Sequence, residues 1–112
     1  MPAYLIALIE VRDAERYREY TLHTPRVIAA FGGRMIVRNG ARHVLEGPAD
    51  PRRVVVVEFP TLDDVLRFHS SPEYTEVRRM REQAGESQII AIDGFGSDAW
   101  AAAVEASGQL SL

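Results

Sequence analysis

Hydrophobic residues lie in short runs that are typical of buried β-strands. Residues 2–11 are almost wholly apolar, and residues 53–59 contain four consecutive valines. Because successive side chains of a strand point to opposite faces, such runs predict strands with apolar residues on both faces. A third apolar run, residues 88–93, predicts a last strand.

The segment after the first strand has the spacing of an amphipathic helix. Asp13 is a suitable N-cap, and Gly32-Gly33 predicts the end of this helix. Pro25 lies inside the pattern, where it removes a backbone donor, so we expect the helix to kink or restart at Thr24. The apolar stripe recurs every three or four residues: Tyr17, Tyr20, Thr24, Val27, Ile28 and Phe31.

A second helical region follows the valine-rich strand and is predicted to break once. Thr61 is the expected N-cap, with Asp64 in the capping-box position. Ser71 and Pro72 are a good N-cap and a good first helical residue, so the helix should restart there and end at Gly85. The inward positions are Val65, Leu66, Phe68, Tyr74, Val77 and Met80.

Turn residues predict the connections between these elements. Asn39-Gly40 lies between residues 34–38 and 41–46 and predicts a hairpin of these two segments, followed by a loop over residues 47–51. An alanine-rich stretch, residues 97–106, predicts a short helix anchored by Trp100, and residues 107–112 are expected to fray.

The order β-α-β followed by β-α-β predicts an α+β fold of the ferredoxin-like type. Its four-stranded antiparallel sheet has the strand order 4-1-3-2, with both helical regions on one face. Residues 1–96 form the domain, and residues 97–112 form a C-terminal tail.

Helices on one face leave the other face of this sheet uncovered. Tyr4, Ile6 and Leu8 of the first strand, with Val54 and Val56 of the third, would then lie in water. Each such side chain forgoes about 1.5–3 kcal/mol of burial. A second copy of the chain is the simplest cover, and it would form a dimeric α/β barrel with an interface of at least about 1,600 Å². The alternative is that the tail folds across the sheet.

Composition excludes several classes of function. The chain has 112 residues, no cysteine, and 13 basic against 16 acidic residues, for a net charge of −3. A cysteine nucleophile, a disulfide frame and a thiolate zinc site are therefore excluded, and an overall attraction to nucleic acid is not expected. All the basic residues are arginine, which excludes Schiff-base lysine chemistry. Without a long apolar run or a signal-like leader, we predict a cytoplasmic, bacterial-type protein that contacts no membrane.

Several short motifs occur in an order that resembles the domain of unknown function 1330 family. They are Gly32-Gly33-Arg34, Leu45-Glu46-Gly47, Val56-Val57-Glu58-Phe59, Ser71-Pro72-Glu73-Tyr74 and Asp93-Gly94. The resemblance runs from Tyr4 to Phe95 and implies membership of the dimeric α/β barrel superfamily. That superfamily includes cofactor-free monooxygenases, muconolactone isomerases, stress-response proteins and haem-handling enzymes, whereas the family itself has no assigned reaction. His69, where an aromatic residue is expected, and the alanine-rich tail depart from the pattern.

Glu58 is the first candidate for chemistry, because a carboxylate in a valine-rich strand is costly unless it is paired or lines a wet cavity. We consider it a general base, with Arg34 of the neighbouring strand as its partner or as an anion stabiliser. The structural alternative is a simple ion pair. Glu46, at a strand end, is a further candidate contact, although a solvated surface position accounts for it better.

The histidines do not have the spacing of a metal site, so no metal or other cofactor is predicted. His69 and His23 both precede a helix break, and the two breaks are expected to line one mouth, where His69 is a second candidate base. His43 is expected at the surface. The predicted substrate contacts are Tyr17, Tyr20, Tyr74, Ser71, His23 and Glu46.

These residues predict a homodimer that holds a small aromatic or carboxylated metabolite between sheet and helices. Cofactor-free acid–base catalysis would use Glu58 or His69 as base and Arg34 as anion stabiliser. A non-catalytic ligand-binding or stress-associated dimer is the alternative. RNA binding ranks last, because the central strands carry valine and isoleucine where stacking aromatics are needed.

Overall fold

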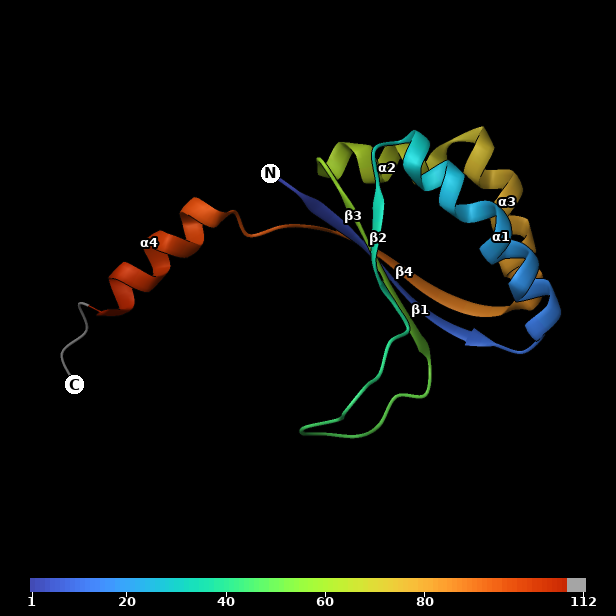
Figure 1. The fold of residues 1–112 in the computed structure, drawn as a ribbon, viewed down its shortest axis with the longest axis horizontal. Helices are drawn as coiled ribbons and strands as arrows, with labels where there is room; N and C mark the ends of the chain where they lie inside the picture. The colour runs from blue at the N-terminus through green and yellow to red at the C-terminus, as the bar shows by residue number, and fades with distance from the viewer. Residues whose placement is uncertain (109–112) are drawn as a thin grey trace.

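In the computed structural model, which describes residues 1–108, the chain forms four helices and four strands (Figure 1). The expected order of strands and helices is confirmed. The elements are β1 (Ala3–Val11), α1 (Ala14–Ala30), β2 (Arg34–Arg38), β3 (Arg53–Phe59), α2 (Leu62–Ser70), α3 (Pro72–Ala84), β4 (Gly85–Asp93) and α4 (Ser97–Gly108).

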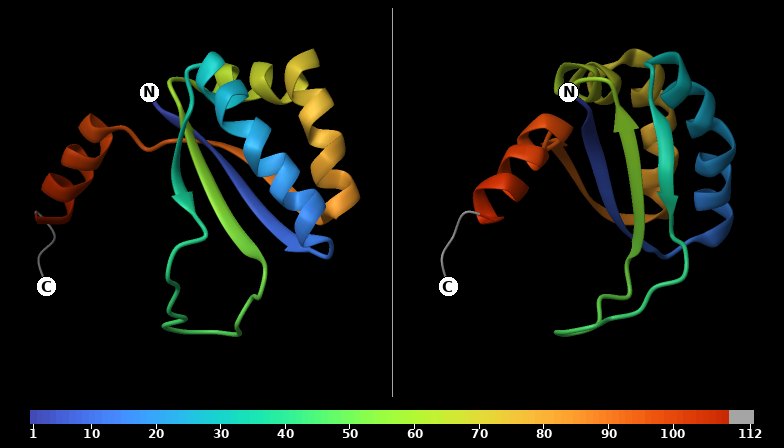
Figure 2. Two further views of the ribbon diagram at one scale, coloured as in Figure 1. Left: turned by 45° about the vertical axis from the view of Figure 1, so that its right-hand side comes forward. Right: turned by 60° about the vertical axis from the view of Figure 1, so that its left-hand side comes forward.

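The four strands form one antiparallel sheet in the order β2-β3-β1-β4, which is the predicted order 4-1-3-2 counted from the other edge. β1 lies in the centre, where Leu5 pairs with Val57 of β3 and with Ala91 of β4. Helices α1, α2 and α3 lie on one side of the sheet (Figure 2). The α+β class and the ferredoxin-like topology are therefore as predicted.

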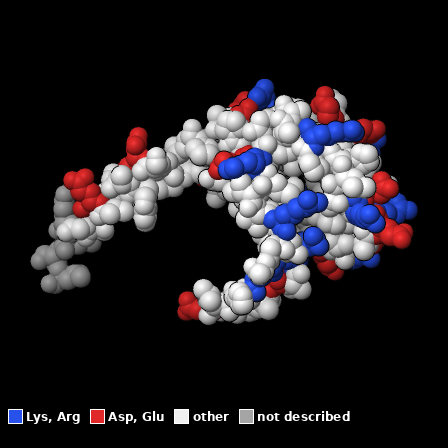
Figure 3. Space-filling model, in the orientation of Figure 1, with Lys and Arg blue, Asp and Glu red and all other residues white. Residues whose placement is uncertain are grey.

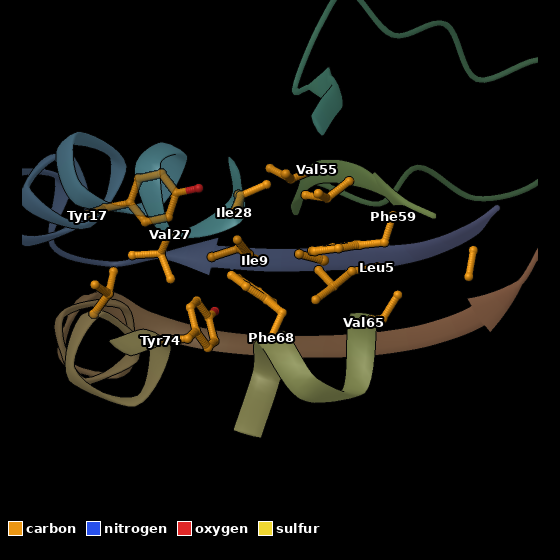
Figure 4. Packing of buried hydrophobic residues seen from close by; sticks show 14 of the residues in the cluster. Leu5, Ile9, Tyr17, Val27, Ile28, Val55, Phe59, Val65, Phe68 and Tyr74 are labelled. Carbon is orange, nitrogen blue, oxygen red and sulfur yellow. The ribbon is translucent and has the colours of Figure 1, made fainter. Parts of the chain in front are cut away.

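The hydrophobic core lies between this sheet and the three helices (Figure 4). Alternate residues of β1 and β3 enter it, so that Leu5 is 6% exposed and Val57 is 2% exposed. Phe68 of α2 lies at the centre, with its ring centroid 5.2 Å from that of Phe59 and 4.4 Å from that of Tyr74. The inward residues of the strands, at every second position, and the apolar stripes of the helices thus pack together in a single core layer.

The helices begin where the sequence predicts. The side chains of Asp13, Thr61 and Ser71 each accept a hydrogen bond from the backbone N–H three residues ahead. The predicted restart of α1 at Thr24 is wrong, because α1 continues through Pro25. Pro25 is exposed, while the buried stripe on both sides of it packs on the sheet, so tertiary packing outweighs the one lost backbone hydrogen bond.

The predicted hairpin of residues 34–38 with 41–46 is also wrong. β2 pairs with β3 instead, and the residues between them form a long loop in which residues 40–51 are all exposed. Asn39 adopts a φ of 47° and accepts a hydrogen bond from the N–H of Val54, so it closes the end of the β2–β3 pair. Asn39 thus adopts the left-handed conformation that an Asn-Gly pair favours, but it lies at the end of β2 and does not form a tight turn between two paired strands.

The face of the sheet opposite the helices, here called the open face, is apolar and incompletely covered. Its residues alternate with the core residues, and most of them are half-buried within the single chain. They are Tyr4, Ile6, Leu8, Val54, Val56, Ile90 and Ile92, paired across the strands in register. The predicted division of the strand residues into two apolar sets is therefore correct.

Helix α4 projects from the body as an arm, on the far side of the sheet from α1 and α3 (Figures 1 and 2). Every residue of α4 is exposed, including Trp100 at 63%. The radius of gyration is 16.9 Å, against about 13 Å for a compact domain of this length. The predicted tail helix is present, but as an arm it does not cover the open face. The frayed end predicted for residues 107–112 falls partly on residues 109–112, outside the described part of the chain.

Candidate functional site

A small cavity lies between α1 and the helix-covered face of the sheet, and we call it the tyrosine cavity. Three phenols reach it, Tyr17 and Tyr20 from α1 and Tyr74 from α3. Figure 4 shows Tyr17 and Tyr74 on the same side of the sheet. The other lining residues are Leu5, Ala7, Ile9, Thr21, Thr24, Ile28, Met35, Arg38, Arg53, Val55, Val57, Phe68 and Ile89.

The hydroxyls of Tyr20 and Tyr74 form a hydrogen bond of 2.9 Å, and the two rings meet edge to face with centroids 6.5 Å apart. The Tyr17 ring lies 5.7 Å from that of Tyr20. Burial raises the pKa of Tyr20 well above its ordinary value of 10, and the neighbouring Tyr74 raises it further. Tyr20 therefore stays protonated at neutral pH and acts as a hydrogen-bond partner rather than as a base.

Two arginines border the cavity from the strands. The guanidinium carbon of Arg53 lies 5.1 Å from the centroid of the Tyr17 ring, which is within cation–π range. Burial raises the pKa of Tyr17, while Arg53 acts in the opposite direction. Arg38 is exposed and belongs to the same lining. The site therefore combines aromatic faces, hydroxyl groups and positive charge.

The tyrosine cavity itself is narrow, with about 30 Å³ open to atoms of the size of water. That is room for about two ordered waters. A surface groove between α1 and β2, about 400 Å³ in volume, shares Ile28, Met35 and Arg38 with it. Met35, which is unbranched and half-buried, lines both the cavity and this groove.

Glu58 and Arg34 do not line the tyrosine cavity, so the structure does not bring these two candidates together with the three phenols. They pair across β3 and β2 with 3.6 Å between Glu58 Oε1 and Arg34 Nη2. The Arg34 side chain is 74% exposed and that of Glu58 is 34% exposed. Val57 and Phe59 point into the core, so Glu58 between them must point to the open face. The geometry is that of the ion pair considered as the structural alternative.

His69 and His23 lie in different grooves, so the single mouth expected for them is wrong. His69 borders a groove between α2 and β4, together with Leu66 and Ala91. Burial lowers its pKa, as do the nearby charges of Arg78 and Arg81. His23 lies between α1 and α3, with its Nε2 3.8 Å from Glu19 Oε2.

The remaining candidates also lie outside the tyrosine cavity. Glu46 and His43 are exposed in the loop that joins β2 to β3. The Ser71 hydroxyl accepts a hydrogen bond from the N–H of Tyr74 and donates one to the carbonyl of Phe68, so its capacity is used in starting α3. Within residues 1–108, no cluster of three or more His, Asp and Glu residues could hold a metal ion, and none of these helices is long and apolar enough to cross a membrane.

Sequence reasoning missed four arginine and methionine positions that the structure brings to this region: Met35, Arg38, Arg53 and Arg81. The signal was available for two of them. Arg53 shares the parity of Val55 and Val57 along β3, which places it on the helix-covered face. Arg81 follows Tyr74 and Val77 at helical spacing, on the inner stripe of α3. A β-bulge between Met35 and Val37 returns Arg38 to that face, and no sequence pattern marks it.

The family model described as domain of unknown function 1330 matches residues 2–95, which cover the sheet, the three packed helices and the tyrosine cavity. The chain belongs to this family. The description assigns no reaction to it. No protein with a curated description matches the chain.

Three solved structures of similar fold come from two proteins that are themselves of unknown function. The RPA0582 protein of Rhodopseudomonas palustris is 22% identical, with a TM-score of 0.68 over 85% of this chain and 83% of that one. Its methylated form gives a TM-score of 0.69 at 22% identity, over 86% and 82% of the two chains. A protein of Bacteroides fragilis NCTC 9343, described as dimeric and ferredoxin-like, is 16% identical with a TM-score of 0.52 over 83% and 96%. These likenesses support the fold.

Proposed function

We propose that this protein is a homodimer that binds a small organic molecule in the tyrosine cavity. The observation that carries the proposal is the enclosure of three phenols beside Arg53, between α1 and the sheet. Ligand sites are typically apolar and aromatic concavities with a few convergent polar groups. Aromatic ring faces suit a flat ligand, and the phenol and guanidinium groups supply the hydrogen-bond donors that orient it.

The open face supports the homodimer. Two copies packed through their open faces would bury Ile6, Val56 and Ile90 in a dimeric α/β barrel. The Bacteroides fragilis protein of similar fold is described as dimeric.

Light scattering on the purified protein tests the dimer. We expect twice the chain mass of 12.5 kDa at micromolar concentration. A monomer of 12.5 kDa with native circular dichroism would contradict this part of the proposal, because the open face would then be stable in water.

A block at the side of the tyrosine cavity tests the binding site. Thr21 lines the cavity and is half-buried on α1, so Thr21→Trp should fill the space without crowding the centre of the core. Leu22 is 67% exposed on the same helix, and Leu22→Trp is the matched control. We expect titration calorimetry to show that benzoate or benzamide binds the wild type and the control, and that Thr21→Trp binds neither. Failure of both probes to bind the wild type would reject the site.

A cofactor-free acid–base enzyme is the second candidate, with His69 as base. The lowered pKa of His69 keeps its imidazole neutral and able to accept a proton at pH 7. Glu58 as base with Arg34 as anion stabiliser would require a site on the open face. The double variant Glu58→Gln/Arg34→Ala decides between the two faces: unchanged probe binding supports the tyrosine cavity, and lost binding by a folded dimer moves the site to the open face.

A further inference from the structure

Arg81 is a buried cation that has no anion beside it. It lies on the inner stripe of α3 after Tyr74 and Val77, and it is only 5% exposed. Its Nε and Nη1 atoms are buried, and neither has a hydrogen-bond partner among the residues that the structure describes. By contrast, most of the arginines that do form ion pairs lie at the surface.

None of the carboxylates of residues 1–108 forms an ion pair with Arg81. The buried polar side chains of residues 1–108 are Thr24, Ser71 and Arg81, and none is a carboxylate. A buried charge without a partner is strongly destabilising, and buried arginines are normally paired. The fold therefore holds a positive charge in its interior that an external anion can neutralise.

Hydrogen-bond donors are in surplus in the same region. Only one of the two hydroxyl hydrogens of Tyr20 and Tyr74 is used in the bond between them, so the other can be donated elsewhere. The Nε of Arg53, on the other border of the tyrosine cavity, is likewise buried without a partner. A region with unpartnered guanidinium donors and no carboxylate among its lining residues matches a ligand rich in acceptor oxygens.

Arg81 lies close enough to the tyrosine cavity to act on it. Its guanidinium carbon is 6.0 Å from the centroid of the Tyr20 ring, which forms part of the cavity wall. Its charge also opposes the effect of burial on the pKa of Tyr20. Arg81 is not itself a lining residue of the cavity, and the Tyr20 ring is the wall residue beside it.

We propose that the ligand of the tyrosine cavity is a small organic carboxylate whose carboxylate group pairs with Arg81. This inference rests on the proposed function, since it names the chemical class of the same ligand. A carboxylate has two coplanar oxygens that match the fork of a guanidinium, and the third donor comes from the Tyr20–Tyr74 pair. The apolar part of the acid faces Leu5, Val55 and Ile89.

Matched acids and amides test this without any mutation. Benzoate and benzamide have nearly the same shape, as do propionate and propionamide, but only the acids are charged at pH 7. Titration calorimetry on the wild-type protein should show each acid binding at least about tenfold more tightly than its amide, because a hydrogen bond to a charged partner is stronger. Equal affinities would overturn the carboxylate assignment while leaving the tyrosine cavity as a binding site.

Variants of Arg81 assign the charge to this residue. Arg81→Gln should weaken benzoate binding by about tenfold or more and leave benzamide unchanged, and Arg81→Lys should restore part of the loss. Arg79→Gln is the control, because Arg79 is exposed on the same helix and pairs with Glu76. An unchanged benzoate affinity in Arg81→Gln would overturn the proposal. The proposal would also be overturned if Arg81→Gln weakened the dimer while the wild type bound benzoate and benzamide equally. Arg81 would then pair with a carboxylate of the partner copy rather than with a ligand.

Discussion

The two faces of the sheet carry similar side chains but meet different surroundings. Val57 points to the helices and is 2% exposed, whereas its neighbour Val56 points to the open face and is half-buried. The charged atoms are spread over the body, while the α4 arm has acidic but no basic atoms (Figure 3). The same valine-rich sequence thus contributes a fully buried core on one face of the sheet and a partly exposed apolar surface on the other.

The largest difference between the two faces should come from placing a charge on each. Val57→Asp buries an unpaired carboxylate and should leave the chain unfolded, because the penalty is comparable with the total stability of about 5–15 kcal/mol. Val56→Asp should instead give a folded monomer. Circular dichroism and light scattering measure both. A Val56→Asp dimer would break the comparison, because the open face would then not be the interface.

A large cavity in the helix-covered core should give the next largest effect. Phe68 is 1% exposed and contacts three other aromatic rings, so Phe68→Ala should lower the free energy of unfolding by about 3–5 kcal/mol. Leu66→Ala on the same helix is the control, and at 53% exposure it should change stability by about 0.5 kcal/mol or less. Urea unfolding measures both. Equal losses would show that α2 does not pack as described.

The hydroxyl pair of the tyrosine cavity should contribute less than the rings that carry it. Tyr20→Phe removes the 2.9 Å hydrogen bond to Tyr74 but keeps the ring, so we expect a loss of about 0.5–1.5 kcal/mol in urea unfolding. Tyr4→Phe, on the open face, is the matched control and should have a smaller effect. A stabilised Tyr20→Phe variant would mean that the hydroxyl is not satisfied in the free protein.

The lowered pKa of His69 should make stability fall on mild acidification. The unfolded chain takes up a proton near pH 6.5, before the native His69 does. The contribution of His69 to the free energy of unfolding is therefore complete above pH 6.5. It is lost as the pH falls from 6.5 to the pKa of His69 in the folded protein. His69→Gln should lose less stability between pH 7.5 and 5.5 than the wild type, and His43→Gln in the exposed loop should match the wild type. Urea unfolding at both pH values decides this.

The smallest effect is expected for the ion pair of the open face. Arg34→Ala should lower the free energy of unfolding by about 0–1 kcal/mol, because the arginine side chain is 74% exposed and water screens the pair. The loss should shrink further in 0.5 M salt. A larger, salt-independent loss would show that a partner subunit buries the pair.

More of the fold than of the site could be predicted. Periodicity located the strands, and the side chains of Asp13, Thr61 and Ser71 marked the helix starts, because both signals are local. The hairpin predicted at Asn39 was wrong, because a turn signal does not identify the segment with which the preceding strand pairs, and β2 pairs with β3. Grouping Glu58 with the tyrosines overlooked the parity of its own strand, since Val57 and Phe59 beside it enter the core.

The sequence by itself determined the order of the elements and the two apolar sets of the central strands, because these follow from side-chain period and backbone preference. The topology of the sheet was inferred from that order, which is the ferredoxin-like one. Only the tertiary structure decided which set the helices cover, and which polar groups meet there. Tyr20, Tyr74 and Arg81 come from helices that are far apart in the chain, and they meet because α1 and α3 pack side by side on one face. Contacts across such a distance depend on packing, which no local pattern encodes.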